Sequence, residues 1–167
     1  MTTPNEFDPR GYPAAPGPGG YQPAGGGAAE PGNLWIRFAA RLIDGLIVGI
    51  VINVVLFATG MFNNFWLPGL LTGLLYFAYF VGCEVGLGWT PGKKILGLEV
   101  HGPGGAPRPD VQQSAIRNSW TLLGVIPFIG GLLELGACIW IAVTINNSPT
   151  RQGKHDELAG GTQVIKV

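Results

Sequence analysis

The stretch "WIRFAARLIDGLIVGIVINVVLFATGM" (residues 35–61) decides the fold, because a charged beginning passes directly into a long apolar run. Arg37 and Arg41 are four positions apart, and Asp44 follows three positions after Arg41. On a helix, side chains at these spacings lie on one face. The apolar part is long enough to cross a bilayer, which takes about 20 residues. The stretch therefore predicts a membrane-spanning helix with a patch of charges at its start.

Composition and the placement of charges support a membrane protein. Charged residues make up 12% of the chain, against about 25% in a typical soluble domain. Residues 45–83 contain no Asp, Glu, Lys or Arg, and Glu134 is the one such residue in 118–150. We therefore predict an all-α membrane protein: a small helical bundle of three to four membrane helices, with a short β-like cytoplasmic insert and a disordered Pro/Gly-rich N-terminal tail.

The domain plan follows from the same patterns. Residues 1–33 are rich in proline and glycine and bury too little apolar surface to fold, so we predict a disordered cytoplasmic tail. The tail lacks a basic region followed by an apolar core, so we expect the membrane segments to direct insertion. Residues 34–167 form the predicted transmembrane domain. Its parts are spans at about 35–61 and 67–88, an insert at 90–109, a helix-break-helix region at 110–145 and a C-terminal segment at 146–167.

Two local signals refine this plan. Asp110 and Gln113 have the spacing of a capping box, which predicts that a helix starts after the insert. Residues 95–101 and 162–167 are short β-like runs on the same predicted side of the membrane. We expect these two runs to pair.

The region 119–145 is open to two interpretations. "IPFIGG" (126–131) puts a proline and two glycines into an apolar run, a cluster that breaks or sharply turns a helix. The region is either one kinked span or a hairpin whose first arm begins near Asp110. Lys and Arg gather in short cytoplasmic loops, and the basic groups share one side only if the number of crossings is even. This favours the hairpin, which puts Glu134 near the turn instead of near mid-membrane.

Several functions are disfavoured by what the sequence contains. The net charge is zero and the chain has no basic stripe with interleaved aromatics, so we expect no nucleic acid partner. Motifs for catalysis or dinucleotide binding are missing, so we expect neither an enzyme nor a cofactor. Cys83 and Cys138 lack metal-ligand spacing, so we expect no metal. The partners that we expect are the lipid bilayer, further copies in a homo-oligomer, and a cytoplasmic protein bound through the tail.

Three blocks of the chain resemble a known pattern: "RFAARLIDGLIV" (37–48), "WTPGKKILGLEV" (89–100) and "RQGKHDELAGGT" (151–162). Their order and spacing resemble the signature blocks of the RDD family of small membrane proteins, a family named for one arginine and two aspartates. The matching residues here are Arg41, Asp44 and Asp156. Lys154 departs from the pattern, because the family often has an apolar residue there. The resemblance implies a multi-spanning membrane protein but no settled activity, although transport has been proposed for the family.

The blocks place many charges near the predicted cytoplasmic boundary. Arg41 and Asp44 are the expected pair within one helix, and guanidinium groups bind carboxylates through two parallel hydrogen bonds. Glu84 or Asp156 is expected to complete the network between helices. The predicted members of this network are Arg41, Asp44, Asp156, Arg37, Glu84, Arg117 and His155.

The role of these charges has alternatives. They either clamp the helices together, or Asp44 and Glu84 line a path for a cation or proton, since ionisable groups inside membranes mark such paths. Lys93 and Lys94 in "TPGKK" (90–94) are candidate contacts to a lipid headgroup. We therefore expect small-ion or proton transport through a polar path near the cytoplasmic face. The alternative is a membrane scaffold or accessory subunit that binds partners through its tail and charged face.

Overall fold

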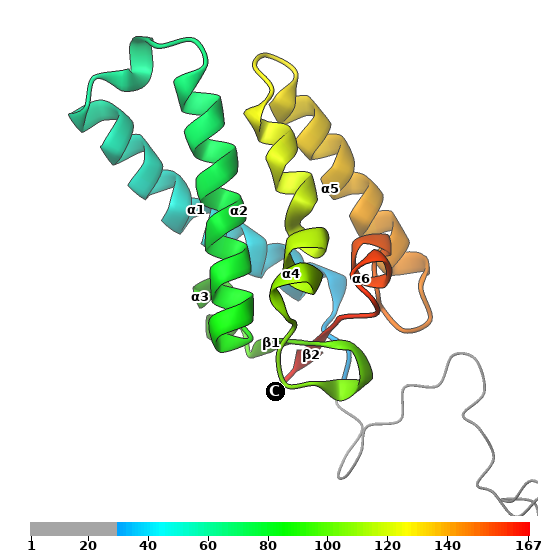
Figure 1. The fold of residues 1–167 in the computed structure, drawn as a ribbon. Helices are drawn as coiled ribbons and strands as arrows, with labels where there is room; N and C mark the ends of the chain where they lie inside the picture. Colours follow the sequence, from blue (N-terminus) through cyan, green and yellow to red (C-terminus); the bar gives the residue numbers. More distant parts are fainter. Residues whose placement is uncertain (1–29) are drawn as a thin grey trace, which may run out of the picture.

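The computed structural model describes residues 30–167. Most of the predicted tail, residues 1–33, therefore lies outside the described residues. The hypothesis that the tail recruits a partner concerns that part of the chain and stays a prediction. Within residues 30–167, three helices are long and apolar enough to cross a membrane. They are α1 (Leu34–Ala58), α2 (Leu67–Leu87) and α5 (Gly130–Asn147), and Figure 1 shows them lengthwise in one bundle. The observed bounds of α1 and α2 lie within a few residues of the predicted spans.

Helices α1 and α2 form an antiparallel hairpin. Val48, Ile52 and Leu56 recur every four residues on α1 and form one buried stripe, against which Tyr76 and Tyr79 of α2 pack. The opposite face of α1 is apolar and exposed: Leu46, Ile50, Val54 and Phe57 are each more than 60% accessible. An apolar outer face of this size is what a bilayer solvates, as expected for a membrane helix.

The helix-break-helix region is a second hairpin. Its first arm consists of α4 (Val111–Asn118) and the 3₁₀ helix η3 (Ser119–Val125), and α5 returns beside it. Figure 1 shows its turn at the same end of the bundle as the α1–α2 loop, and the rings of Phe65 and Phe128 meet there with centroids 4.7 Å apart. We call this the loop end. The structure therefore has the hairpin and not a single kinked span.

A glycine lets the second hairpin approach the first closely. A Cβ on Gly73 of α2 would lie 2.5 Å from Cγ2 of Val125 and 3.1 Å from its backbone nitrogen. The capping box predicted from the sequence is also present: Asp110 accepts from the backbone of Gln113, and the Gln113 side chain accepts from the backbone of Asp110. The start of α4 is therefore set locally, while its depth against α2 is set by packing.

Short elements close the opposite end of the bundle, which we call the charged end. Helix α3 (Pro91–Ile95) leads into β1 (Leu98–His101) and the 3₁₀ turn η2 (Pro103–Gly105), and α6 (Lys154–Leu158) leads into β2 (Gln163–Lys166). Strands β1 and β2 pair antiparallel, with Leu98 opposite Lys166. The predicted pairing of the insert with the C-terminal segment is confirmed. This sheet covers a small apolar core with Ala40 of α1.

Candidate functional site

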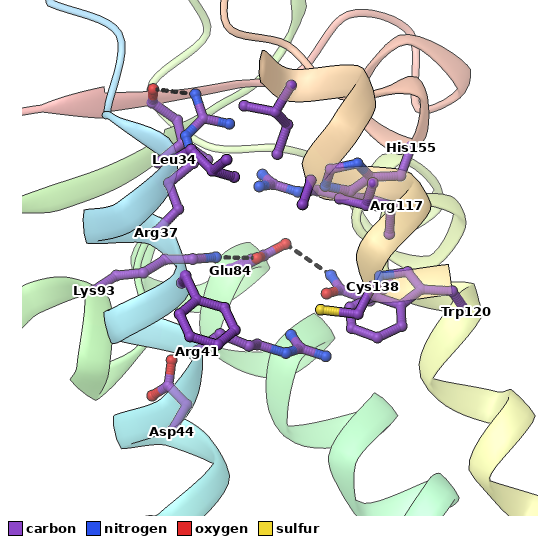
Figure 2. A pocket seen from close by; sticks show the side chains of 16 residues that line it. Leu34, Arg37, Arg41, Asp44, Glu84, Lys93, Arg117, Trp120, Cys138 and His155 are labelled. Atoms are coloured by element: carbon purple, nitrogen blue, oxygen red, sulfur yellow. Dashed lines mark hydrogen bonds and ion pairs between the residues drawn. The ribbon is translucent and has the colours of Figure 1, made fainter. Parts of the chain in front are cut away.

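A cavity of about 100 Å³ lies at the charged end, between α1 and α5 and over α2 and α4 (Figure 2). Its apolar walls come mainly from α1 and α5. Its charged lining residues are Arg37, Arg41, Asp44, Glu84, Lys93 and Arg117. The lining thus brings together ionisable side chains from four helices that are far apart in the sequence.

Asp44 fastens α1 to α3. Its buried carboxylate accepts from the hydroxyl of Thr90 at 2.5 Å, the hydroxyl of Tyr79 at 2.8 Å and the backbone N–H of Gly92 at 2.8 Å. The predicted ion pair with Arg41 is wrong, because the carboxylate faces the first turn of α3. The backbone and Thr90 donors there take up the oxygens that Arg41 would need.

Glu84 ties α2 to α3 and α4. Its buried carboxylate accepts from Nζ of Lys93 at 2.5 Å, from Oγ of Ser114 at 2.9 Å and from Nδ2 of Asn118 at 2.9 Å. Burial lowers the pKa of Lys93 to about 8, and the neighbouring Glu84 charge opposes that shift. Sequence reasoning missed Ser114 and Asn118. Their four-residue spacing on α4 was visible, but nothing in the sequence pointed to Glu84 as their target.

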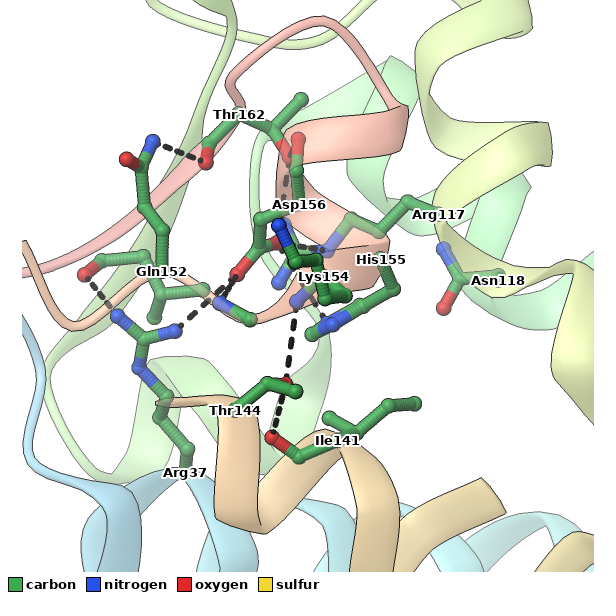
Figure 3. Close-up of polar contacts among 12 residues, drawn as sticks. Arg37, Arg117, Asn118, Ile141, Thr144, Gln152, Lys154, His155, Asp156 and Thr162 are labelled. Carbon is green, nitrogen blue, oxygen red and sulfur yellow. Dashed lines mark hydrogen bonds and ion pairs between the residues drawn. The ribbon is translucent and has the colours of Figure 1, made fainter. Parts of the chain in front are cut away.

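Asp156 is the third buried carboxylate, after Asp44 and Glu84, and it is the centre of a cluster of polar contacts that we call the Asp156 cluster (Figure 3). Its buried carboxylate lies 3.1 Å from Nε of Arg117 and 3.5 Å from Nη1 of Arg37. It also accepts from the backbone of Gly153 at 3.1 Å and from Thr162 at 3.2 Å. Burial alone would raise the pKa of Asp156, but the positive charges around it, led by Arg117, lower it. The predicted network across helices is therefore present at this aspartate.

His155 lies in the same cluster but is not one of its cations. Its Nε2 is 3.5 Å from the Asp156 carboxylate. Burial lowers the pKa of His155 to about 4, despite the nearby carboxylate. The imidazole is therefore neutral at pH 7, and two arginines alone balance Asp156.

Arg41 is held in a different way from the other charged residues. Its guanidinium carbon lies 3.5 Å from the ring centroid of Phe80 and 4.5 Å from that of Trp120, so the cation is in contact with two aromatic rings. Its Nη2 is buried and has no hydrogen-bond acceptor among residues 30–167. Nη1 of Arg117, a residue only 5% exposed, also lacks one within the described range. The sequence held no sign that Trp120 and Phe80 would enclose Arg41.

The predicted headgroup lysines are separated by the fold. Lys93 points inward to Glu84, and its side chain is only 12% exposed. Lys94 is exposed and lies 3.7 Å from Glu99 on the outer surface. The expectation that both present their ammonium groups at the surface therefore holds for Lys94 alone.

The predicted path residues, Asp44 and Glu84, both line the cavity. Each carboxylate already accepts from three donors, so an entering cation has to displace at least one of them. Their role as cation ligands stays a prediction.

Comparison with protein-family models gives a match to the RDD family over residues 31–160. No curated protein and no solved structure matches the chain.

Proposed function

The chain belongs to the RDD family of membrane proteins, and from that premise we propose that it moves a small ion across the bilayer, with the charged cavity as the ion's binding site. We also propose that the charged end faces the cytoplasm. The nine Lys and Arg residues of 30–167 all lie toward that end, and the loops of the loop end, 59–66 and 126–129, have none. Short cytoplasmic loops are enriched in these residues.

The observation that carries the proposal is the cavity itself. Four basic side chains and two carboxylates line a space enclosed by helices whose outer faces are apolar. Ionisable groups are expensive in such surroundings and, where they occur, face a polar interior and serve ion or proton pathways. Clamping alone requires that the charges pair with one another. A lined cavity beside them supports passage of an ion.

Polar groups continue from the cavity toward the loop end. Arg41 lines the cavity, and its charge interacts with the carboxylate of Glu134 across the bundle. Tyr76 of α2 adds a hydroxyl to this part of the bundle, which donates to the carbonyl of Gly45 at 2.7 Å. Glu134 is four residues into α5, about 6 Å from the loop end at 1.5 Å per residue. This half-buried carboxylate supports an ion path that extends beyond the cavity.

Ion flux into liposomes tests the proposal. The full-length protein is reconstituted, and uptake of Na⁺, K⁺, H⁺, chloride and phosphate is compared with uptake by protein-free liposomes. We expect flux of one ion well above the background, and a loss of about ten-fold or more in Arg41→Gln. Arg151→Gln, which removes an exposed guanidinium outside the cavity, is the matched control.

Two outcomes of the flux measurement are decisive. Folded, correctly reconstituted protein that conducts none of these ions contradicts transport. Flux that is unchanged in Asp44→Asn and Glu84→Gln removes those two carboxylates from the ion path, while it leaves the cavity as the binding site.

A further inference from the structure

We propose that the cavity binds a phosphate-type oxyanion, held by the guanidinium groups of Arg41 and Arg117; this rests on the proposed function in taking the cavity as the ion site. Transport alone leaves the class of ion open, and an oxyanion site specifies it. Its sources are inorganic phosphate from solution or the phosphate of a lipid headgroup, and both offer the same tetrahedral oxygens to the same donors.

The pattern of ion pairs around the cavity favours an anion. Glu84 forms an ion pair with Lys93. Asp156 is not one of the lining residues, and it pairs with both Arg37 and Arg117. Arg41 forms no ion pair with any carboxylate of residues 30–167. Glu134 acts on the charge of Arg41 only from a distance, without forming an ion pair. Arg41 is therefore the lining cation with no carboxylate in contact among residues 30–167, and a bound anion would supply that contact.

The hydrogen-bonding groups point to the same conclusion. A cation needs oxygens that are not already occupied, but the oxygens of Asp44 and Glu84 accept from three donors each. The unpaired buried side-chain atoms of residues 30–167 are Nη2 of Arg41, Nη1 of Arg117 and Nδ1 of His155, all in residues that line the cavity, and the two guanidinium nitrogens can only donate. Buried donors without acceptors are rare in folded proteins and call for a ligand or water. A cavity with spare donors suits an acceptor-only ligand.

Arg41 is preorganised for such a ligand. Its guanidinium group lies against the rings of Phe80 and Trp120, so aromatic contacts hold the cation while its Nη2 donor stays unpaired among residues 30–167. A planar fork of N–H donors matches the spacing of oxygens in phosphate and binds two at once. Stacking also fixes the side chain before the ligand arrives, which lowers the entropic cost of binding.

The size of the cavity limits the ligand. A volume of about 100 Å³ is well below the roughly 300–1,000 Å³ of pockets that enclose drug-sized molecules. It matches a single phosphate group better than a whole nucleotide. Phe38 of α1 and Ile141 and Ile145 of α5 form apolar walls, a lining that also suits the glycerol end of a lipid whose chains stay in the bilayer.

Ligand-induced stabilisation of the purified full-length protein in neutral detergent tests the proposal. One arm adds sodium phosphate against sodium chloride at equal ionic strength. The other adds dioctanoyl phosphatidic acid against dioctanoylglycerol, which has the same chains without the phosphate. We expect a saturable rise in Tm with at least one phosphate compound. A rise with inorganic phosphate identifies a free anion, and a rise with the lipid alone identifies a headgroup.

Variants tie the effect to the guanidinium groups. Arg41→Gln should weaken the apparent affinity about ten-fold or more, while Arg151→Gln should titrate as the wild type does. If Arg41→Gln does not fold, Arg41→Lys keeps the charge but not the fork and should still weaken binding several-fold. The oxyanion site is wrong if neither compound stabilises beyond its control, or if the Arg41 variant that folds binds as tightly as the wild type.

The two proposals fail separately. Phosphate binding without flux of any ion leaves the oxyanion site standing and contradicts transport. Flux without phosphate binding leaves transport standing and contradicts the oxyanion assignment.

Discussion

The backbone N–H of Gly92 donates to the carboxylate of Asp44 at 2.8 Å, across an approach of α3 to α1 that only glycine permits. A Cβ at position 92 would lie 2.3 Å from the carbonyl oxygen of Ala40 and 2.9 Å from the Asp44 carboxyl group. The first contact is with backbone and cannot move away cheaply. The signature aspartate and the glycine of "TPGKK" therefore form one structural unit.

Gly92→Ala should destabilise the protein, because α3 must move away from α1 and the Asp44 hydrogen bond is lost. Overpacking of this kind costs about 1–3 kcal/mol, and the lost hydrogen bond to a charged group adds about 1.5–3 kcal/mol. Thermal unfolding in detergent measures the change. Gly82→Ala is the matched control, since a Cβ at Gly82 of α2 meets nothing within 4 Å. Equal melting temperatures for the two variants would contradict the close approach.

Asp156→Asn should lower stability by about 3–5 kcal/mol, because removing one partner of a buried ion pair leaves the others uncompensated. Arg37 and Arg117 would then share a buried site without a carboxylate in contact. The matched control is Glu157→Gln in the same helix, whose carboxylate is exposed and pairs with Lys154. An exposed pair contributes about 0–1 kcal/mol. Chemical unfolding that gives both variants the same loss would show that Asp156 is not the centre of a buried network.

Much of the bundle could be predicted from the sequence, because the relevant signals are local. The lack of charges in residues 45–83 outlines α1 and α2. Asp110 and Gln113, three positions apart, mark the start of α4. The pairing of β1 with β2 followed from two β-like runs on one side of the membrane. Each of these features depends on residues close together in the chain, or on which segments lie in lipid and which in water.

The pairing of the buried charges could not be predicted in the same way. Helical spacing put Arg41 and Asp44 on one face, but spacing does not say where each side chain points. Asp44 turns to α3 because Gly92 lets that helix come close, and Arg41 lies against the rings of Phe80 and Trp120. Both outcomes depend on how separate helices pack, which is a property of the tertiary structure.

The protein should lose stability as the pH falls from about 6.5 to 4. The pKa of His155 is lowered from 6.5 to about 4 in the folded state, so in this window the unfolded chain takes up a proton that the folded chain excludes. The loss in the free energy of unfolding begins below pH 6.5. It reaches at most about 3 kcal/mol near pH 4, because each unit of difference between the two pKa values corresponds to about 1.36 kcal/mol. Asp156, whose pKa is also lowered, adds to the loss at still lower pH.

Unfolding measured at several pH values between 7 and 4 checks this loss. His155→Gln should flatten the slope between pH 6.5 and 4, because the excluded proton is gone. His101→Gln, which removes a histidine of β1 outside the Asp156 cluster, should keep the wild-type slope. A wild-type slope in His155→Gln would mean that His155 binds its proton equally well in the folded and unfolded chains, which contradicts the lowered pKa.

Cysteine labelling in intact cells should place both loops of the loop end outside and the charged end inside. Asn64 and Ile129 are exposed in the two loops, and Gly104 and Lys154 belong to short elements of the charged end. In a background with Cys83→Ala and Cys138→Ala, an impermeant maleimide should label Asn64→Cys and Ile129→Cys. Gly104→Cys and Lys154→Cys should react only after the membrane is opened. The reason is that the rings of Phe65 and Phe128 meet at 4.7 Å, which keeps the two loops on one side. Labelling of Asn64→Cys without Ile129→Cys would contradict the second hairpin, and labelling of the charged-end pair alone would reverse the orientation.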